Sequence, residues 1–132
     1  MTQPERQKAK ESWIYSRSAF SRRSHQFPNL TVFVSLIDRI CELGYSEKLY
    51  AGTSLDNLVI SVRPNPRDRR QTILVIPQEK DVEFRLYPKD GEAEVSTVVR
   101  DQAAAALDRL LPRLTAQLET LSSGSAHSDS DA

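Results

Sequence analysis

Residues 81–88, DVEFRLYP, alternate apolar and more polar side chains without interruption. Successive side chains of an extended strand point to opposite faces, so Val82, Phe84 and Leu86 fall on one side and the residues between them on the other. Such alternation is typical of a half-buried strand, whose sheet packs one face on a core and leaves the other in water. A chain with this strand therefore has to provide apolar cover for one face of a sheet.

Three further segments predict the rest of that sheet. Residues 48–64, KLYAGTSLDNLVISVRP, indicate a short strand, a turn at 52–57 and a longer strand. Residues 71–77, QTILVIP, are apolar on both faces, which favours a central strand, and residues 92–98, EAEVSTV, favour a short edge strand. Because the connections are of hairpin length, we expect an antiparallel meander of four or five strands.

Two helices with apolar stripes can supply the cover. Residues 29–43 repeat apolar side chains at helical spacing, and Gly44 follows where a left-handed residue commonly ends a helix. Residues 99–121 carry a second stripe of alanine and leucine, and Pro112 within it predicts a kink. Together these segments predict an α+β fold, a two-layer sandwich with both helices packed on one face of the sheet.

The first 27 residues differ in character from the rest. They carry six basic and two acidic side chains, although the formal net charge of the whole chain is zero. Residues 11–27, ESWIYSRSAFSRRSHQF, interleave aromatic and basic side chains, and a thin line of residues at helical spacing runs through them. That line consists of Ala9, Trp13, Ser16 and Phe20. Such a stretch either grips a partner or packs as an added element against its own domain.

Length and composition indicate one small domain with tails. The chain of 132 residues divides into a basic aromatic arm at 1–27, a single α+β domain at 28–121 and a disordered tail at 122–132. The single cysteine, Cys41, excludes an intrachain disulfide, and no apolar run is long enough for a membrane span or a signal peptide. We therefore expect a cytoplasmic protein.

No segment carries a motif for catalysis, metal binding or phosphate binding. His25 is expected to be an ordinary exposed side chain, and His127 lies in the tail. Cys41 falls on the apolar stripe of a helix, where cysteine usually behaves as a small buried hydrophobe. The prediction is a protein that is not an enzyme and has neither a metal nor another cofactor.

The leading functional hypothesis is a non-catalytic protein-interaction module of the accessory, chaperone or immunity-like kind. It would dock on a specific protein partner, or on a second copy of itself, through a sheet face or a helix groove with the arm as a clasp. Tyrosine, tryptophan and arginine dominate the energetics of protein interfaces. The residues expected to contact the partner are Trp13, Tyr15, Arg17, Phe20, Tyr50, Arg85 and Tyr87.

The alternative hypothesis is a nucleic-acid-binding protein. Aromatic rings stack on bases and basic side chains follow phosphates, so the arm and the arginine-rich loop at 63–70 suit a single strand. The expected phosphate contacts are Arg22, Arg23, Arg63, Arg67, Arg69 and Arg70. Salt distinguishes the two hypotheses, because affinity that depends on phosphate contacts falls steeply as the salt concentration rises.

Overall fold

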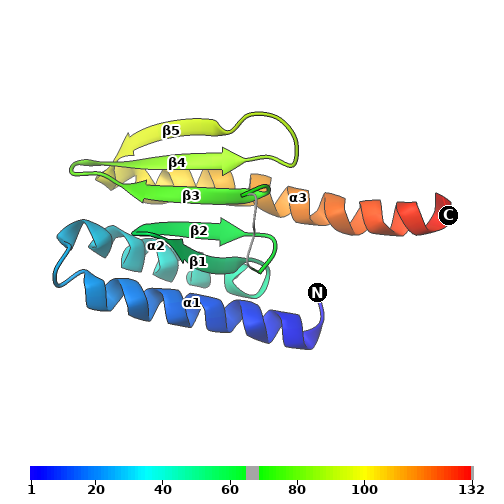
Figure 1. Ribbon diagram of the computed structural model, residues 1–132, viewed down its shortest axis with the longest axis horizontal. Coiled ribbons are helices and arrows are strands. Elements are labelled where there is room, and N and C mark those ends of the chain that lie inside the picture. The colour runs from blue at the N-terminus through cyan, green and yellow to red at the C-terminus, as the bar shows by residue number, and fades with distance from the viewer. Residues whose placement is uncertain (65–68, 132) are drawn as a thin grey trace.

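The computed structural model describes residues 1–64 and 69–131, with side chains described as far as Gln117. Its centre is a five-stranded antiparallel sheet in which each strand pairs with the next along the chain (Figure 1). The predicted meander is confirmed. The strands are β1 (Tyr50–Ser54), β2 (Asn57–Ser61), β3 (Thr72–Pro77), β4 (Asp81–Tyr87) and β5 (Glu94–Val99).

The strand register explains which face of the sheet is covered. Ile60 of β2 lies opposite Ile73 of β3, and Ile73 lies opposite Leu86 of β4. All three side chains belong to the buried core, together with Val82 and Phe84 of β4. The alternation in β4 therefore has the predicted consequence, because its apolar residues all face the core.

Helices α2 (Thr31–Glu42) and α3 (Ala103–Asp131) cover this face and lie behind the sheet in Figure 1. The α+β sandwich is thus confirmed. Arg39 of α2 and Asp108 of α3 join the helices by two hydrogen bonds of 3.2 and 2.7 Å. The 3-10 turns are η1 (Pro28–Leu30), η2 (Tyr45–Glu47) and η3 (Arg100–Gln102).

The buried stripe of α2 excludes one residue that the sequence assigned to it. Phe33, Leu36, Ile37 and Ile40 are buried, whereas Cys41 is exposed. A stripe that begins at Phe33 and repeats at i+3, i+4 and i+7 ends at Ile40 and turns the next residue to the rim. The expectation of a buried cysteine is therefore wrong.

Helix α3 continues through Pro112 without a break. Proline removes the backbone donor that would bond to the carbonyl four residues earlier. The turns on either side are held by Leu107, Leu111 and Leu114, which are fully buried. Helix α3 extends into residues 122–131, which were predicted to belong to a disordered tail. Side chains are described only as far as Gln117, so the disorder of the tail stays a prediction.

Residues Gln3–Arg23 form a third helix, α1, which lies along β1 at one side of the sheet (Figure 1). Thr2 and Glu5 form a capping box at its start, with hydrogen bonds of 3.1 and 3.2 Å. Its buried line matches the predicted helical spacing, and Trp13 and Phe20 belong to the same core as the sheet and α2. The N-terminal stretch is therefore part of the scaffold.

Helix α1 also closes the outer edge of β1. The indole Nε1 of Trp13 donates to the carbonyl oxygen of Leu49 at 2.8 Å, and the backbone N–H of Ala51 donates to Ser12 Oγ at 2.9 Å. An edge strand ordinarily leaves such backbone groups unpaired. The helix therefore bonds to backbone groups at the start of the β1 edge that a neighbouring strand would otherwise pair.

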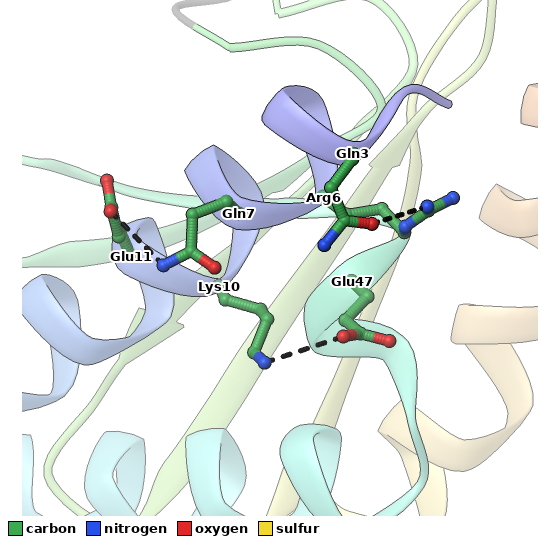
Figure 2. A network of polar contacts seen from close by, with 6 residues as sticks. All are labelled: Gln3, Arg6, Gln7, Lys10, Glu11 and Glu47. Carbon is green, nitrogen blue, oxygen red and sulfur yellow. Dashed lines mark hydrogen bonds and ion pairs between the residues drawn. The ribbon is translucent and has the colours of Figure 1, made fainter.

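Exposed polar contacts surround the first turns of α1 (Figure 2). Arg6 donates to Gln3 at 2.7 Å, and Gln7 donates to Glu11 at 3.3 Å, one turn further on. Lys10 reaches Glu47 of η2 at 3.5 Å. This last contact ties the helix to the turn that precedes β1.

Candidate functional site

A groove of about 780 Å³ lies between α1, the first two strands and the described part of the β2–β3 loop. Ligand-binding clefts commonly measure about 300–1,000 Å³. Helix α1 forms one wall, the loop forms another, and the floor is the sheet face that α2 and α3 leave uncovered. This groove is the candidate functional site.

The α1 wall consists of residues beside the helix's buried line, among them Lys8, Glu11, Ser12 and Tyr15. Residues three, four and seven positions apart share one face of a helix, which explains why these side chains border the same groove. The Tyr15 side chain is 70% exposed. An aromatic ring left in water forgoes roughly 2 kcal/mol of burial free energy, which a bound partner can recover.

The floor of the groove is open above Gly52. This residue lies opposite Val59 of β2, and a Cβ atom built at Gly52 would meet no other atom within 4 Å. Two residues earlier, Tyr50 lies opposite Ser61, and both side chains are buried. The floor therefore combines free space with a tyrosine that is held in place.

Arg69 extends from the loop across the floor. Its φ angle of 61° is in the left-handed region, and its carbonyl oxygen accepts a hydrogen bond of 2.6 Å from Thr72 Oγ1, which holds the turn. Its guanidinium donates to Ser54 Oγ at 3.3 Å and to the phenol of Tyr87. Among the described residues, no carboxylate forms an ion pair with Arg69.

Tyr87 lies beside the groove, in the same cross-strand row as Tyr50. Burial by itself would raise the pKa of its phenol, but hydrogen bonds from Arg85 and Arg69 outweigh burial and lower that pKa. Arg85 also donates to Glu83 at 2.5 Å, and its bonds to Tyr87 and Glu83 raise the pKa of its guanidinium. Tyr87 thus contacts both Arg85 and Arg69.

The groove carries an excess of positive charge. Among the described lining residues, Lys8, Arg63 and Arg69 are basic and Glu11 is the one acidic residue. Arg63 donates to the carbonyl of Arg70 at 3.1 Å, which keeps its side chain near the loop. Charges of one sign along a cleft with protein walls raise the local concentration of ions of the opposite sign. The groove is therefore suited to anionic groups.

Several predicted partner contacts serve the fold instead. Trp13 and Phe20 are each 1% exposed because they fill the core beside α2, so neither is a surface contact. Tyr50, predicted to be exposed, is 6% exposed, and burial raises the pKa of its phenol. Arg17 donates two hydrogen bonds to Asp38 of α2, at 2.7 and 3.1 Å. Its guanidinium is thus occupied within the chain.

The remaining predicted contacts gather at the uncovered face. Tyr15 lines the groove, Tyr87 lies next to it through its contact with Arg69, and Arg85 in turn contacts Tyr87. The N-terminal stretch, which both hypotheses used, and the arginine-rich loop of the nucleic-acid hypothesis thus meet at one site.

The predicted phosphate contacts are scattered by comparison. Arg23 forms an ion pair with Asp56 and lies over the ring of Phe27, 5.8 Å from its centre. Arg70 donates to the carbonyl of Gly91 at 2.6 Å. Arg22 is exposed near the end of α1. Arg63 and Arg69 line the groove, whereas Arg67 lies outside the described residues.

Sequence reasoning missed Lys8, Glu11 and Gly52. A signal for Gly52 was present, because a glycine inside a strand commonly marks a close approach of another group to the backbone. Lys8 and Tyr15 are seven residues apart and therefore share a helix face. No site could be assigned to that helix face, because the sequence does not show which element packs beside it.

Other chemistry is sparse in the described part of the chain. No group of three or more His, Cys, Asp or Glu side chains there could hold a metal ion. Burial raises the pKa of the Cys41 thiol, and the nearby charge of Asp38 raises it further. None of the helices described is both long and apolar enough to cross a membrane.

The groove therefore brings together an exposed ring, an oriented guanidinium and an open floor. No protein-family model, curated protein or solved structure matches the chain.

Proposed function

We propose that the protein is a non-catalytic interaction module that binds an acidic, extended segment of a partner protein in the groove between α1 and the sheet. The observation that carries the proposal is the guanidinium of Arg69, which Ser54 and Tyr87 hold over the floor. An acidic side chain entering the groove pairs with a cation that is already oriented, so little side-chain entropy is lost on binding. The proposed module is of the accessory, chaperone or immunity-like kind.

Tyr15 supplies the apolar part of the contact. Tyrosine and arginine are both enriched among the residues that contribute most to binding energy at protein interfaces. The free space above Gly52 leaves room for a side chain of the bound segment between the Tyr15 wall and Arg69. Lys8 on the helix wall offers a second cation to the same segment.

The distribution of charge favours a protein partner over a nucleic acid. Salt-sensitive binding to nucleic acid typically uses about 6–10 phosphate contacts along a strand. Lys10, Arg17 and Arg23 pair with carboxylates of their own domain, which neutralises half of the six basic side chains in the N-terminal stretch. The basic groove is therefore local, which suits a short acidic segment.

The proposal includes a cytoplasmic location. The single cysteine, Cys41, can form no disulfide within the chain, which is common in reducing compartments. Binding of the proposed segment requires no metal or cofactor, because Lys8 and Arg69 supply the opposite charge.

Fluorescence polarisation tests the proposal with a short labelled peptide in which Asp and Glu alternate with Ala. A peptide with Asn and Gln in place of the acids is the comparison, and only the acidic peptide should bind. Arg69→Ala should weaken binding about tenfold or more, because hydrogen bonds to charged groups contribute about 1.5–3 kcal/mol. Arg22→Ala removes an exposed arginine of α1 outside the groove and should leave the affinity unchanged.

Gly52→Leu blocks the groove in an independent way. The φ angle of Gly52 is not in the left-handed region, and the open space above it accepts a side chain. The variant should keep its circular dichroism spectrum and lose peptide binding. The proposal is wrong if the acidic peptide does not bind, or if both variants bind it as the unchanged protein does. Salt-dependent binding of oligo-dT, weakened equally by Arg22→Ala and Arg69→Ala, would favour the nucleic-acid hypothesis instead.

A further inference from the structure

The two edge strands of the sheet, β1 and β5, differ in how they are covered. The edge at β1 is covered by α1, with Ser12 and Trp13 bonded to its backbone. Strand β5 forms the opposite edge, and among the described residues no segment pairs with its outer side (Figure 1). Five of the six β5 residues are exposed, including Val95 at 59% and Val99 at 54%.

Strand β5 lacks the features by which edge strands avoid pairing. Proteins usually protect such edges with lysine, proline, a bulge or a covering element. The sequence of β5, EVSTVV, has neither lysine nor proline and contains one charged residue. Its register with β4 runs from Glu94 to Val99 without a bulge. The outer side of β5 is therefore a regular template for an added strand.

We propose that a second copy of this chain pairs with β5 in the antiparallel direction, so that one sheet runs through both molecules across a two-fold axis. Antiparallel pairing of a strand with its own copy places residues symmetrically about the axis. With Thr97 on the axis, Val95 lies opposite Val99 of the second copy.

This register is selected by the side chains of β5. Val95, Thr97 and Val99 lie on the uncovered face, since they pair with the alternating outward residues of β4. Directly opposite residues on one face have Cβ atoms about 4.5–5.5 Å apart, so two valine pairs flank the central threonine pair. Placing Ser96 on the axis instead sets Val95 against Thr97 and Glu94 against Val98. That register loses both valine pairs.

The self-complementary pattern favours a second copy over an unrelated strand. A two-fold interface uses the same patch on both molecules, and the Val95, Thr97 and Val99 row matches itself when it is reversed. The groove lies at the β1 side of the sheet, so pairing at β5 leaves it open. The inference is therefore independent of the proposed function, and Arg69→Ala should leave self-association unchanged.

Sedimentation velocity of the full chain across a wide concentration range tests the proposal. We expect a monomer–dimer equilibrium in which the molar mass rises from 14.9 kDa towards twice that value. Thr97→Lys sets two like charges opposite each other on the axis and should raise the dimer dissociation constant about tenfold or more. Thr97 is exposed, so the variant should keep its circular dichroism spectrum. Ser18→Lys, at an exposed position of α1, is the matched control.

Disulfide trapping tests the register in a Cys41→Ser background. Thr97→Cys should cross-link to its own copy on mild oxidation, because the two Cβ atoms approach the separation that a disulfide needs. Val95→Cys mixed with Val99→Cys should give a mixed cross-linked dimer, whereas Ser96→Cys alone should give little. A monomer at every concentration, or a dimer as strong in Thr97→Lys as in Ser18→Lys, overturns the proposal. Preferential trapping of Ser96→Cys overturns the register.

Discussion

The indole Nε1 of Trp13 and the carbonyl oxygen of Leu49, 36 residues apart in the chain, are joined by a buried hydrogen bond of 2.8 Å. Both residues are at most 1% exposed, so water cannot replace either partner. The bond attaches the N-terminal helix to the residue that precedes β1. The only tryptophan of the chain thus helps to hold the helix against the sheet edge.

Replacing Trp13 by Phe should destabilise the protein by about 2–4 kcal/mol. The change leaves the Leu49 carbonyl without a donor, at about 1–3 kcal/mol, and adds the loss of packing from a smaller ring. Urea unfolding followed by circular dichroism measures the loss. Tyr15→Phe, at a 70% exposed position, is the control and should change stability by less than about 0.5 kcal/mol. Equal effects of the two changes would contradict the structural role of Trp13.

Replacing Ser12 by Ala should cost about 1 kcal/mol and loosen the edge of β1. Ser12 Oγ is the acceptor for the backbone N–H of Ala51, and the part-buried donor loses its partner in the variant. Native-state hydrogen exchange should become faster at Ala51. Ser18→Ala, on an exposed part of α1, should leave that rate as it is. Unchanged protection of Ala51 in Ser12→Ala would show that α1 does not close this edge.

The phenol of Tyr87 should titrate below the ordinary tyrosine pKa of about 10. Because folding lowers this pKa, the group adds stability as pH rises through the folded value, and the gain is complete above the unfolded value. Ultraviolet absorbance of tyrosinate, compared between the unchanged protein and Tyr87→Phe, isolates this titration. Arg69→Ala should move the pKa of Tyr87 upward by removing one of the hydrogen bonds that lower it. An unchanged titration in that variant would place Arg69 away from Tyr87.

The carboxyl of Asp38 should titrate below its usual range, because the hydrogen bonds from Arg17 outweigh the effect of burial on its pKa. A lowered folded pKa contributes stability above the unfolded value of about 3.9, and this contribution is lost as pH falls through the folded value. Both side chains are nearly half exposed, so the effect should be small and should shrink as salt is added. Carboxyl-resolved NMR titration measures the pKa of Asp38. Arg17→Gln should return it towards the ordinary value, and Arg22→Gln should not.

The sheet and the helices α2 and α3 could be predicted because each signal lies within one continuous segment. The alternation of β4 and the stripe from Phe33 to Ile40 depend only on local spacing, and local spacing determines which side chains share a face. The uncertainty about α1 has a physical cause. Two of its four buried residues are Ala9 and Ser16, whose small size gives the helix a thin stripe.

The groove could not be predicted from the sequence. Lys8, Gly52 and Arg69 come from a helix, a strand and a loop, and the position of α1 beside β1 brings them together. Tyr50 illustrates the same limit. Strand alternation assigns Tyr50 to the face of the sheet that points away from the core. Residues of α1, some 40 positions earlier in the chain, border that face. The burial of Tyr50 therefore does not follow from the strand pattern.

The cover that α1 provides for β1 also determines how many neighbours one sheet can accept. A sheet with one free edge strand can pair with one further molecule, so edge-to-edge association stops at two molecules. A chain without α1 would have two free edge strands, so each added molecule would expose a new edge strand for the next molecule. The hydrogen bonds of Ser12 and Trp13 at the β1 side would therefore limit the proposed pairing through β5 to two molecules.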